Sequence, residues 1–168
     1  MTPMQQLHRR QGREQAFRML FSADQSPSDL ADVIAVEENL RALGDAAPSL
    51  ATEQGEEAWS FSSALGREAW EFACELSRGT WSELARIDAK LDELAVGWTV
   101  PRMAAADRAL LRLAVFEILW RDDVPIAVTI NEVVELAKQY GTDDSPKFIN
   151  GILGTLARQT AGAAEPGG

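Results

Sequence analysis

The residues that most often carry covalent or metal chemistry are scarce in this chain. Among its 168 residues are one histidine, His8, and one cysteine, Cys74. A lone cysteine cannot form an intramolecular disulfide, and no Cys/His cluster has the spacing of a zinc site. Cys74 lies beside the apolar stripe of its helix pattern with no basic residue in the preceding turn, which favours a structural thiol over a nucleophile. The sequence therefore predicts no metal and no cofactor.

Acidic residues are numerous, and two pairs could act as a general acid and base. They are Asp107 with Glu117, and Asp143 with Asp144. Neither pair stands near a histidine or cysteine in an organised spacing, so helix capping and solvated faces explain them better than catalysis. The sequence also lacks a glycine-rich phosphate-binding loop. We expect no catalytic residues and no enzymatic activity.

Binding chemistry has more support, and its first element is a cluster of arginines near the start of the chain. Residues 8–18 contain four arginines against a single acid, Glu14. The whole chain has a net charge of −10, which argues against broad, nonspecific attachment to nucleic acid. A basic arm on an acidic body suits a selective binder, but the same arm could be a solvated terminus.

A second binding element lies where the last helix pattern begins. Lys147 and Phe148 follow a polar turn that contains Asp144 and Ser145. Phe148 stands at the margin of the apolar stripe, where it could close the core or stack on an unpaired base. Lys147 could contact phosphate beside the free N–H groups of a helix start. Local sequence leaves a capped structural turn and a binding surface equally open.

The elements that must position these residues are helices, because strand signals are nearly absent. The apolar spacing predicts an all-α fold of about seven helices in two packed subdomains, at residues 1–79 and 80–160, before a disordered tail at 161–168. Residues 102–121 are apolar almost all round, which predicts a central buried helix. A long flexible loop is expected at residues 44–57.

Several helix boundaries have their own signals. The first helix is expected at residues 10–23, the second from a cap at Ser26, and the third at residues 59–78 with its end at Gly79. Thr80 with Glu83 matches a capping box for the fourth helix. No apolar run approaches the roughly 20 residues of a membrane helix, and the N-terminus has no secretory signal, so a cytoplasmic protein is expected.

Short stretches along the chain match one known family. They are Arg13-Glu14, Ala16 and Leu20-Phe21; Asp107-Arg108, Leu110 to Ala114 and Phe116-Glu117; Asp123-Val124-Pro125; Ile130-Asn131-Glu132; Leu136-Ala137-Lys138; and Asp144-Ser145, Lys147 to Gly151 and Leu153. In these stretches the chain resembles the NusB family of bacterial transcription antitermination factors. The C-terminal half carries most of the resemblance, and residues 22–80 are diverged.

The resemblance implies an all-helical fold of two packed subdomains that binds boxA-type single-stranded RNA of ribosomal RNA operons. It also implies a heterodimer with NusE, a protein of the small ribosomal subunit, that joins NusA, NusG and RNA polymerase and suppresses termination. By position, the RNA contacts would be Arg9, Arg10, Arg13, Lys147 and Phe148, and the partner-facing residues would be Phe21 and Asp144. Gln11 and Gly12 interrupt the basic run that the family often has, which leaves open the affinity for RNA without the partner.

Three alternatives accompany this interpretation. A NusB-like domain also occurs fused to RNA cytosine methyltransferases, and that alternative requires a catalytic domain after the helices. A protein-interaction module would bind no RNA even with its partner present. The free protein could also form a homodimer that covers its own binding surface.

Overall fold

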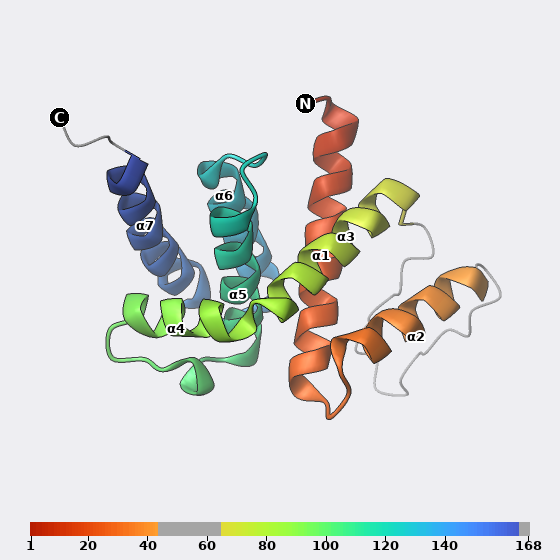
Figure 1. Ribbon diagram of the computed structural model, residues 1–168, viewed down its shortest axis with the longest axis horizontal. Coiled ribbons are helices and arrows are strands. Elements are labelled where there is room, and N and C mark those ends of the chain that lie inside the picture. Colours follow the sequence, from red (N-terminus) through yellow and green to blue (C-terminus); the bar gives the residue numbers. More distant parts are fainter. Residues whose placement is uncertain (44–64, 165–168) are drawn as a thin grey trace.

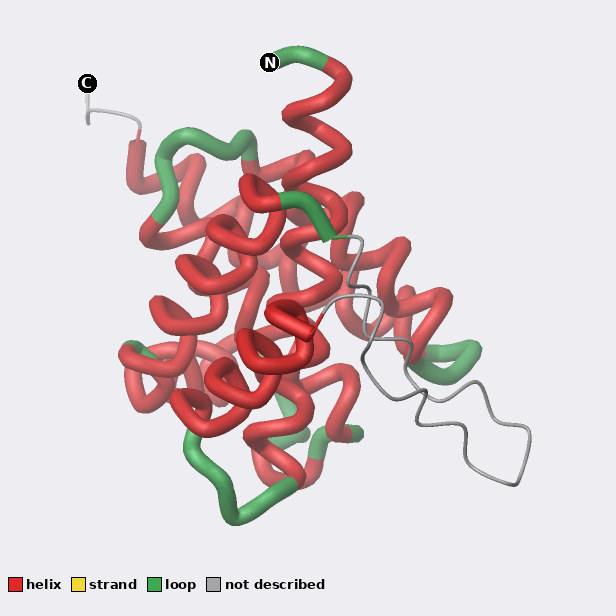
Figure 2. The backbone as a smooth tube through the Cα atoms, turned by 90° about the vertical axis from the view of Figure 1, so that its right-hand side faces the viewer, coloured by secondary structure: helices red, strands yellow, loops and turns green. Residues whose placement is uncertain are grey.

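The computed structural model describes residues 1–43 and 65–164, and helices joined by short connections make up nearly all of them (Figure 1). Within these residues no strand occurs, as the tube in Figure 2 shows. The predicted all-α class is confirmed, and so is the expectation of about seven helices. The described elements are α1 (Pro3–Gln25), α2 (Leu30–Leu43), α3 (Arg67–Ser82), α4 (Leu84–Leu94), the 3-10 helix η2 (Val100–Arg102), α5 (Ala105–Trp120), α6 (Ile126–Tyr140) and α7 (Ser145–Ala164).

Helix α5 is the centre of the fold, as its apolar composition predicts. It packs against α1, α3, α4, α6 and α7. Leu110, Leu111 and Leu113 point in different directions around the helix, yet all three are fully buried. A helix that is apolar on every side is stable only when neighbours cover every side, so the other helices are arranged around α5.

The polar residues of α5 tie it to its neighbours. Charged side chains enter an interior only when ion pairs and hydrogen bonds compensate for the lost hydration. The pairs are Arg108 with Asp24 of α1 at 2.6 Å, Arg112 with the same Asp24 at 3.0 Å and with Asp88 of α4 at 2.8 Å, and Glu117 with Arg13 of α1. These contacts fix how α1 and α4 sit on the central helix.

Gly12 lets α1 and α3 approach closely. A Cβ at this position would lie 2.6 Å from the carbonyl oxygen of Ala69 and 2.9 Å from the ring of Phe72. Real Cβ atoms do not come so near a backbone oxygen, so the crossing requires glycine. The interruption of the arginine run at Gly12 therefore has a structural cause.

The first helix is longer than expected, because it begins at Pro3 and not near Arg10. Thr2 is its N-cap, and its hydroxyl accepts a hydrogen bond from the backbone N–H of Gln5 at 3.2 Å. The Gln5 side chain accepts one in return from the N–H of Thr2 at 2.9 Å. This capping box, with proline in the first turn, is a sequence signal for a helix start.

The expected end of the third helix at Gly79 is wrong. Helix α3 continues to Ser82, and Thr80 is buried inside it. The Thr80 hydroxyl donates to the carbonyl of Leu76 at 2.7 Å, so it does not cap α4. Gly79 serves packing instead, since a Cβ there would overlap the ring of Phe116. The expected subdomain boundary at residue 79 falls inside α3, and the division into two subdomains stays a prediction.

Two other boundaries also differ from expectation. Helix α2 begins at Leu30, where the carboxylate of Asp29, and not Ser26, accepts the Leu30 N–H at 2.8 Å. Helix α7 extends to Ala164, so the first residues of the expected tail are helical, as suits their alanine content. The expected loop at 44–57, the start of the third helix at 59 and residues 165–168 lie outside the described residues.

Candidate nucleic-acid and partner interface

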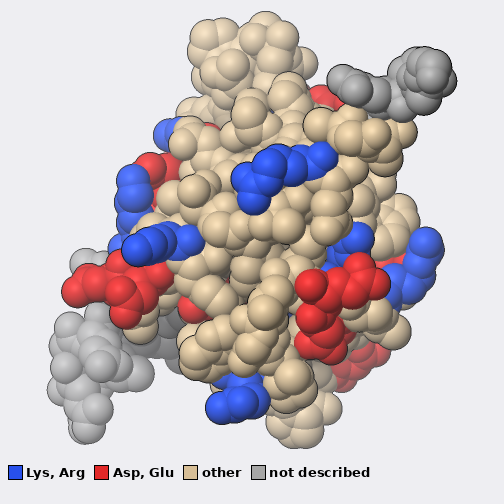
Figure 3. Space-filling view, turned by 90° about the vertical axis from the view of Figure 1, so that its left-hand side faces the viewer, with Lys and Arg blue, Asp and Glu red and all other residues tan. Residues whose placement is uncertain are grey.

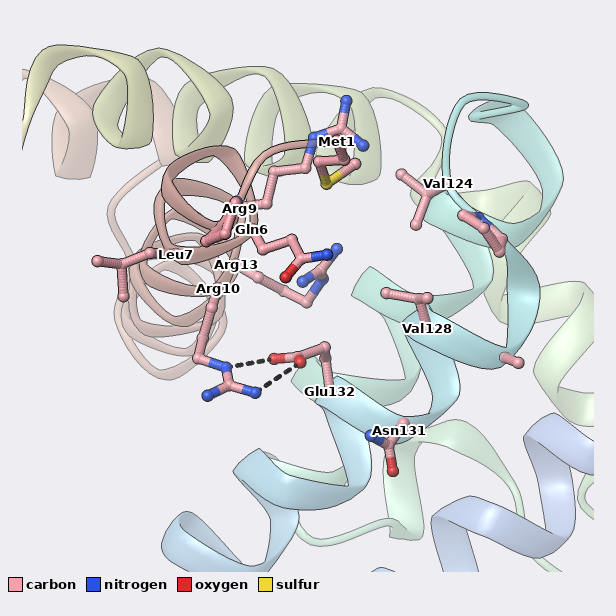
Figure 4. A pocket seen from close by; sticks show the side chains of 13 residues that line it. Met1, Gln6, Leu7, Arg9, Arg10, Arg13, Val124, Val128, Asn131 and Glu132 are labelled. Atoms are coloured by element: carbon pink, nitrogen blue, oxygen red, sulfur yellow. Dashed lines mark hydrogen bonds and ion pairs between the residues drawn. The ribbon is translucent and has the colours of Figure 1, made fainter.

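A groove of about 790 Å³ runs between the N-terminal half of α1 and the start of α6. Figure 4 shows the two helices facing each other across it, with side chains from both in the space between. Gln6, Arg9 and Arg10 line it from α1, and Val128 and Asn131 from α6. The groove therefore combines arginine and amide groups with an apolar wall.

The two accessible arginines of this groove are already paired with acids. Arg10, the more exposed, donates from Nε and Nη2 to the Glu132 carboxylate at 3.0 and 2.9 Å (Figure 4). That carboxylate raises the pKa of Arg10. Arg9 donates to Asp123 at 2.6 Å. Hydrogen bonds from Arg121, and then from Arg9, lower the pKa of Asp123 to about 2. A phosphate would have to compete with these carboxylates for the arginines.

Arg13, expected to contact RNA, is buried. Its side chain is 2% exposed and that of Glu117 is fully buried. The Arg13 guanidinium donates two hydrogen bonds to the Glu117 carboxylate, one of them from Nε to Oε2 at 2.9 Å. Breaking this pair would leave a charge without a partner in the interior, so Arg13 offers no group to a phosphate at the surface. The arginine binds α1 to α5 instead.

A second depression, of about 450 Å³, lies between the end of α4 and the start of α7. Asp144, Lys147 and Phe148 all line it. Asp144 and Lys147 are exposed, whereas Phe148 is half-buried and packs against the core. Its ring also meets the ring of Trp98 edge-on, with centroids 6.4 Å apart. Phe148 therefore both closes the core and faces the depression.

The start of α7 is held firmly by a small polar cluster. Ser145 is buried, and its hydroxyl accepts the backbone N–H of Thr142 at 2.9 Å. Burial raises the pKa of Asp107, and a hydrogen bond with Ser145 offsets part of that rise. Gly141 makes the turn possible, because a Cβ there would lie 2.5 Å from the Ser145 hydroxyl. The cluster fixes the direction in which Lys147 and Phe148 leave the helix.

A third depression, of about 570 Å³, lies between α1 and α2, and Phe21 lines it together with Arg18 and Glu37. Phe21 is half-buried and packs against Phe17, with ring centroids 6.1 Å apart. Burial raises the pKa of Glu37 to about 7, although the positive charges of Arg18 and Arg41 oppose the rise. The predicted partner-facing residues Phe21 and Asp144 thus lie in different depressions.

The predicted site residues are therefore distributed over three places. Arg9 and Arg10 share the groove between α1 and α6, Lys147, Phe148 and Asp144 share the α4–α7 depression, and Phe21 lies between α1 and α2. On the face drawn in Figure 3, Lys and Arg side chains stand apart, with tan surface and acidic groups between them. No continuous basic band covers that face.

Sequence reasoning missed four residues of these surfaces. Asp123 and Glu132 pair with the arginines, and the signal for them was weak, because their partners are more than a hundred residues away in sequence. The Trp98 ring meets the ring of Phe148, and the Arg102 guanidinium lies 5.7 Å from the centroid of the Trp98 ring. An aromatic residue in a polar connector, followed by arginine, was the available signal.

Other chemistry has little basis in the described residues. Among residues 1–43 and 65–164, no group of three His, Cys, Asp or Glu side chains could hold a metal ion. Cys74 is buried, and burial raises the pKa of its thiol, which keeps it protonated and unreactive. None of the described helices is long and apolar enough to cross a membrane.

The fold and these surfaces define the class of protein: an all-helical body with arginines along one groove and a lysine–aromatic corner at the start of its last helix. The family model described as the NusB family matches residues 10–158. The chain belongs to the NusB family.

Relatives from other bacteria carry the name transcription antitermination protein NusB. The one from Beutenbergia cavernae is 41% identical over 154 residues, which cover 89% of each chain. The one from Saccharopolyspora erythraea is 56% identical over 89 residues, which are 49% of this chain and 60% of that protein. These relatives are named for transcription antitermination and not for a catalytic activity.

Solved structures agree with this assignment. A NusB structure from T. maritima is 32% identical, has a TM-score of 0.71, and the match covers 95% of this chain and 93% of that one. A structure of antitermination factors NusB and NusE in complex with dsRNA is 20% identical, with a TM-score of 0.69, and covers 90% of this chain and 97% of that one. At that identity the second likeness supports the fold alone.

Proposed function

We propose that this protein is an RNA-binding transcription antitermination factor that binds boxA-type single-stranded RNA of ribosomal RNA operons together with NusE. The observation that carries the proposal is the family match over residues 10–158. The match includes the whole α7 corner, which Lys147 and Phe148 form, and the groove between α1 and α6 apart from the residues before Arg10. NusA, NusG and RNA polymerase would be the further partners of the assembled complex.

Arg9 and Arg10 are the proposed phosphate contacts of the groove. Both lie on its wall, and Arg10 is 64% exposed, so its guanidinium can exchange the Glu132 carboxylate for a phosphate. The exchange costs one ion pair for each one formed, which keeps the affinity of the free protein for RNA low. Arg13 supports these contacts indirectly by holding α1 on α5.

Lys147 and Phe148 are the proposed contacts of the α7 corner. Phe148 supplies an aromatic ring for stacking on a base, and Lys147 supplies a positive charge for a phosphate. The N–H groups of Ser145 and Phe148 are already bonded to the carbonyls of Thr142 and Asp144, so the lysine and the ring carry the contact. Because α6 has 15 residues, the corner lies roughly 22 Å along the helix from the start of the groove. One strand of RNA would bridge the two places.

NusE is proposed to dock on the depression that Phe21 lines, with Asp144 as a second contact. The ribosomal partner would add basic surface to a chain whose net charge is −10. A partner that supplies positive charge makes RNA binding depend on its presence, which is a coupling between two binding sites.

The test is a titration of boxA-containing RNA with the protein, with and without NusE, at two salt concentrations. We expect weak binding by the protein alone and markedly tighter binding with NusE, with preference for the boxA sequence over a scrambled strand. A duplex of the same sequence is the control, and it should bind more weakly because the proposal requires unpaired bases. Absence of any binding in both conditions would leave a protein-interaction module as the function.

A further inference from the structure

A tryptophan is held at the surface beside the start of α7. Trp98 is 51% exposed, and its neighbour Val96 is 91% exposed. Tryptophan is enriched at interfaces because it joins a large apolar ring to a polar N–H, so a half-exposed tryptophan next to a depression is a candidate binding surface. Trp98 belongs to the connection between α4 and η2.

This connection is ordered by specific hydrogen bonds. Gly97 adopts a φ of +84°, in the region that favours glycine. The N–H of Trp98 donates to the carbonyl of Ala95 at 3.0 Å, and the N–H of Val100 donates to the Asp92 carboxylate at 3.0 Å. These hydrogen bonds hold the backbone at Trp98, so little backbone entropy would be lost on binding.

The surroundings of Trp98 combine aromatic and cationic groups. Its ring meets Phe148 at an interplanar angle of 69°, and both rings border the depression of about 450 Å³. Lys147 stands on the same border, and Arg102 lies over the Trp98 ring at 5.7 Å. The volume lies within the roughly 300–1,000 Å³ typical of small-ligand pockets, which suits a base with its ribose and is small for a helix.

We propose that Trp98, together with Arg102, forms a second stacking platform that continues the RNA surface beyond Phe148 and holds one unpaired nucleotide. The base would stack on Trp98, and the phosphate would lie toward Lys147 and Arg102. The exposed carboxylate of Asp144, the proposed second contact of NusE, lines the same depression, where its charge keeps phosphate on the side of Lys147 and Arg102. This inference rests on the proposed RNA-binding function.

The inference is tested with the complex of the full chain and NusE on boxA-type RNA. Trp98→Ala should weaken RNA binding about ten-fold, the loss of one base–aromatic stack, while Trp98→Phe should recover most of it. Leu119→Ala, at an exposed apolar residue of α5 that lines neither the groove nor either depression, is the matched control and should bind as the parent protein does. Thermal melting checks that each variant is folded.

A second measurement locates the contact directly. RNAs that each carry one 5-iodouridine, placed at successive positions, are irradiated in the complex and the cross-linked peptides identified. We expect one position to cross-link to Trp98. Unchanged RNA affinity of Trp98→Ala, or equal losses for Trp98→Ala and Trp98→Phe, would overturn the stacking role while RNA binding itself stands.

Two further outcomes separate the possible failures. If Trp98→Ala weakens binding to NusE in the absence of RNA, the platform is a protein-docking surface and the proposal is wrong. If the parent protein binds no RNA with NusE present, the proposal falls together with the proposed function.

Discussion

Three arginines on one helix have three different environments. The side chain of Arg10 is 64% exposed, that of Arg9 is 25% exposed and that of Arg13 is 2% exposed. One turn of the helix separates Arg9 from Arg13, so both point toward the same side of α1. What differs is depth: α1 projects from the body at its start (Figure 1), whereas Arg13 is buried against Glu117 of α5. Residue type alone does not distinguish a phosphate contact from a buried ion pair.

Arg13→Ala should destabilise the protein by about 3–5 kcal/mol, because it leaves the Glu117 carboxylate buried without a partner. Urea unfolding measures the change. The double variant Arg13→Met with Glu117→Leu should recover most of the loss, since it removes both charges together. Arg10→Ala, at an exposed ion pair, should change stability by less than about 1 kcal/mol. A fully stable Arg13→Ala protein that binds RNA poorly would instead support a direct RNA contact.

Glu37 should make stability depend on pH. Its folded pKa is about 7, above the ordinary value of 4.5, so between these values the folded state holds a proton that the unfolded state has released. The contribution of Glu37 to stability is therefore complete below pH 4.5 and is lost as the pH rises through about 7. Glu37→Gln should remove this fall and raise stability at pH 8. The comparison is urea unfolding at several pH values, with the exposed Glu38→Gln as control. Parallel pH profiles of the parent and Glu37→Gln proteins would contradict the assignment.

At the scale of the helix, close approach depends on small residues. Gly12 permits the crossing of α1 and α3, and Gly79 leaves room for the ring of Phe116 from α5. Both are buried or half-buried within helices, where glycine costs backbone entropy relative to alanine. The packing of the neighbouring helices compensates for this cost, so these glycines are part of the interface between elements.

Gly12→Ala should destabilise the protein by about 1–3 kcal/mol, because the new methyl group would collide with the Ala69 carbonyl and push α3 away. Thermal or urea unfolding measures the loss. Gly151→Ala is the matched control on α7, where a Cβ meets nothing within 4 Å. There the same change should stabilise by roughly 0.5–1 kcal/mol, since only helix propensity is altered. Equal effects at the two sites would show that the crossing tolerates a side chain.

For the molecule as a whole, acidity and pairing would restrain the proposed RNA binding. The net charge is −10, and the accessible arginines of the α1–α6 groove are each bound to a carboxylate of the same chain. Such a body would repel random nucleic acid, and the proposed phosphate contacts would stay paired with carboxylates until a specific complex forms. Under the proposed function, selectivity for RNA would arise from the few places where cations and aromatic rings occur together.

Glu132→Gln should tighten RNA binding by several-fold, because it releases Arg10 to pair with phosphate. The plot of log affinity against log salt concentration should also steepen by about 0.7, the value for one phosphate of a single strand. Fluorescence anisotropy titrations at several salt concentrations measure both. Glu135→Gln is the control, since it removes the same charge from α6 but from a pair with Lys138. Equal gains in the two variants would point to net charge and not to Arg10.

The sequence by itself determined the helical class, the burial of α5 and the signals at the start of α7. These follow from local periodicity and capping, which act within a few residues and can be recognised in one chain. It also supplied the family resemblance, which the match over residues 10–158 confirms. Its errors at Gly79 and Thr80 arose because both residues carry local signals for a helix end, while packing against α5 favours a continuous helix.

Only the tertiary structure decided what each polar residue does. Arg13 pairs with Glu117, 104 residues away, and Arg10 pairs with Glu132, 122 residues away. Pairing at such separations depends on how helices cross, and no local pattern encodes it. The same holds for Trp98, which the connection after α4 brings against Phe148 of α7. Burial and distance, which decide whether a charge is a contact or a structural tie, are properties of the assembled helices.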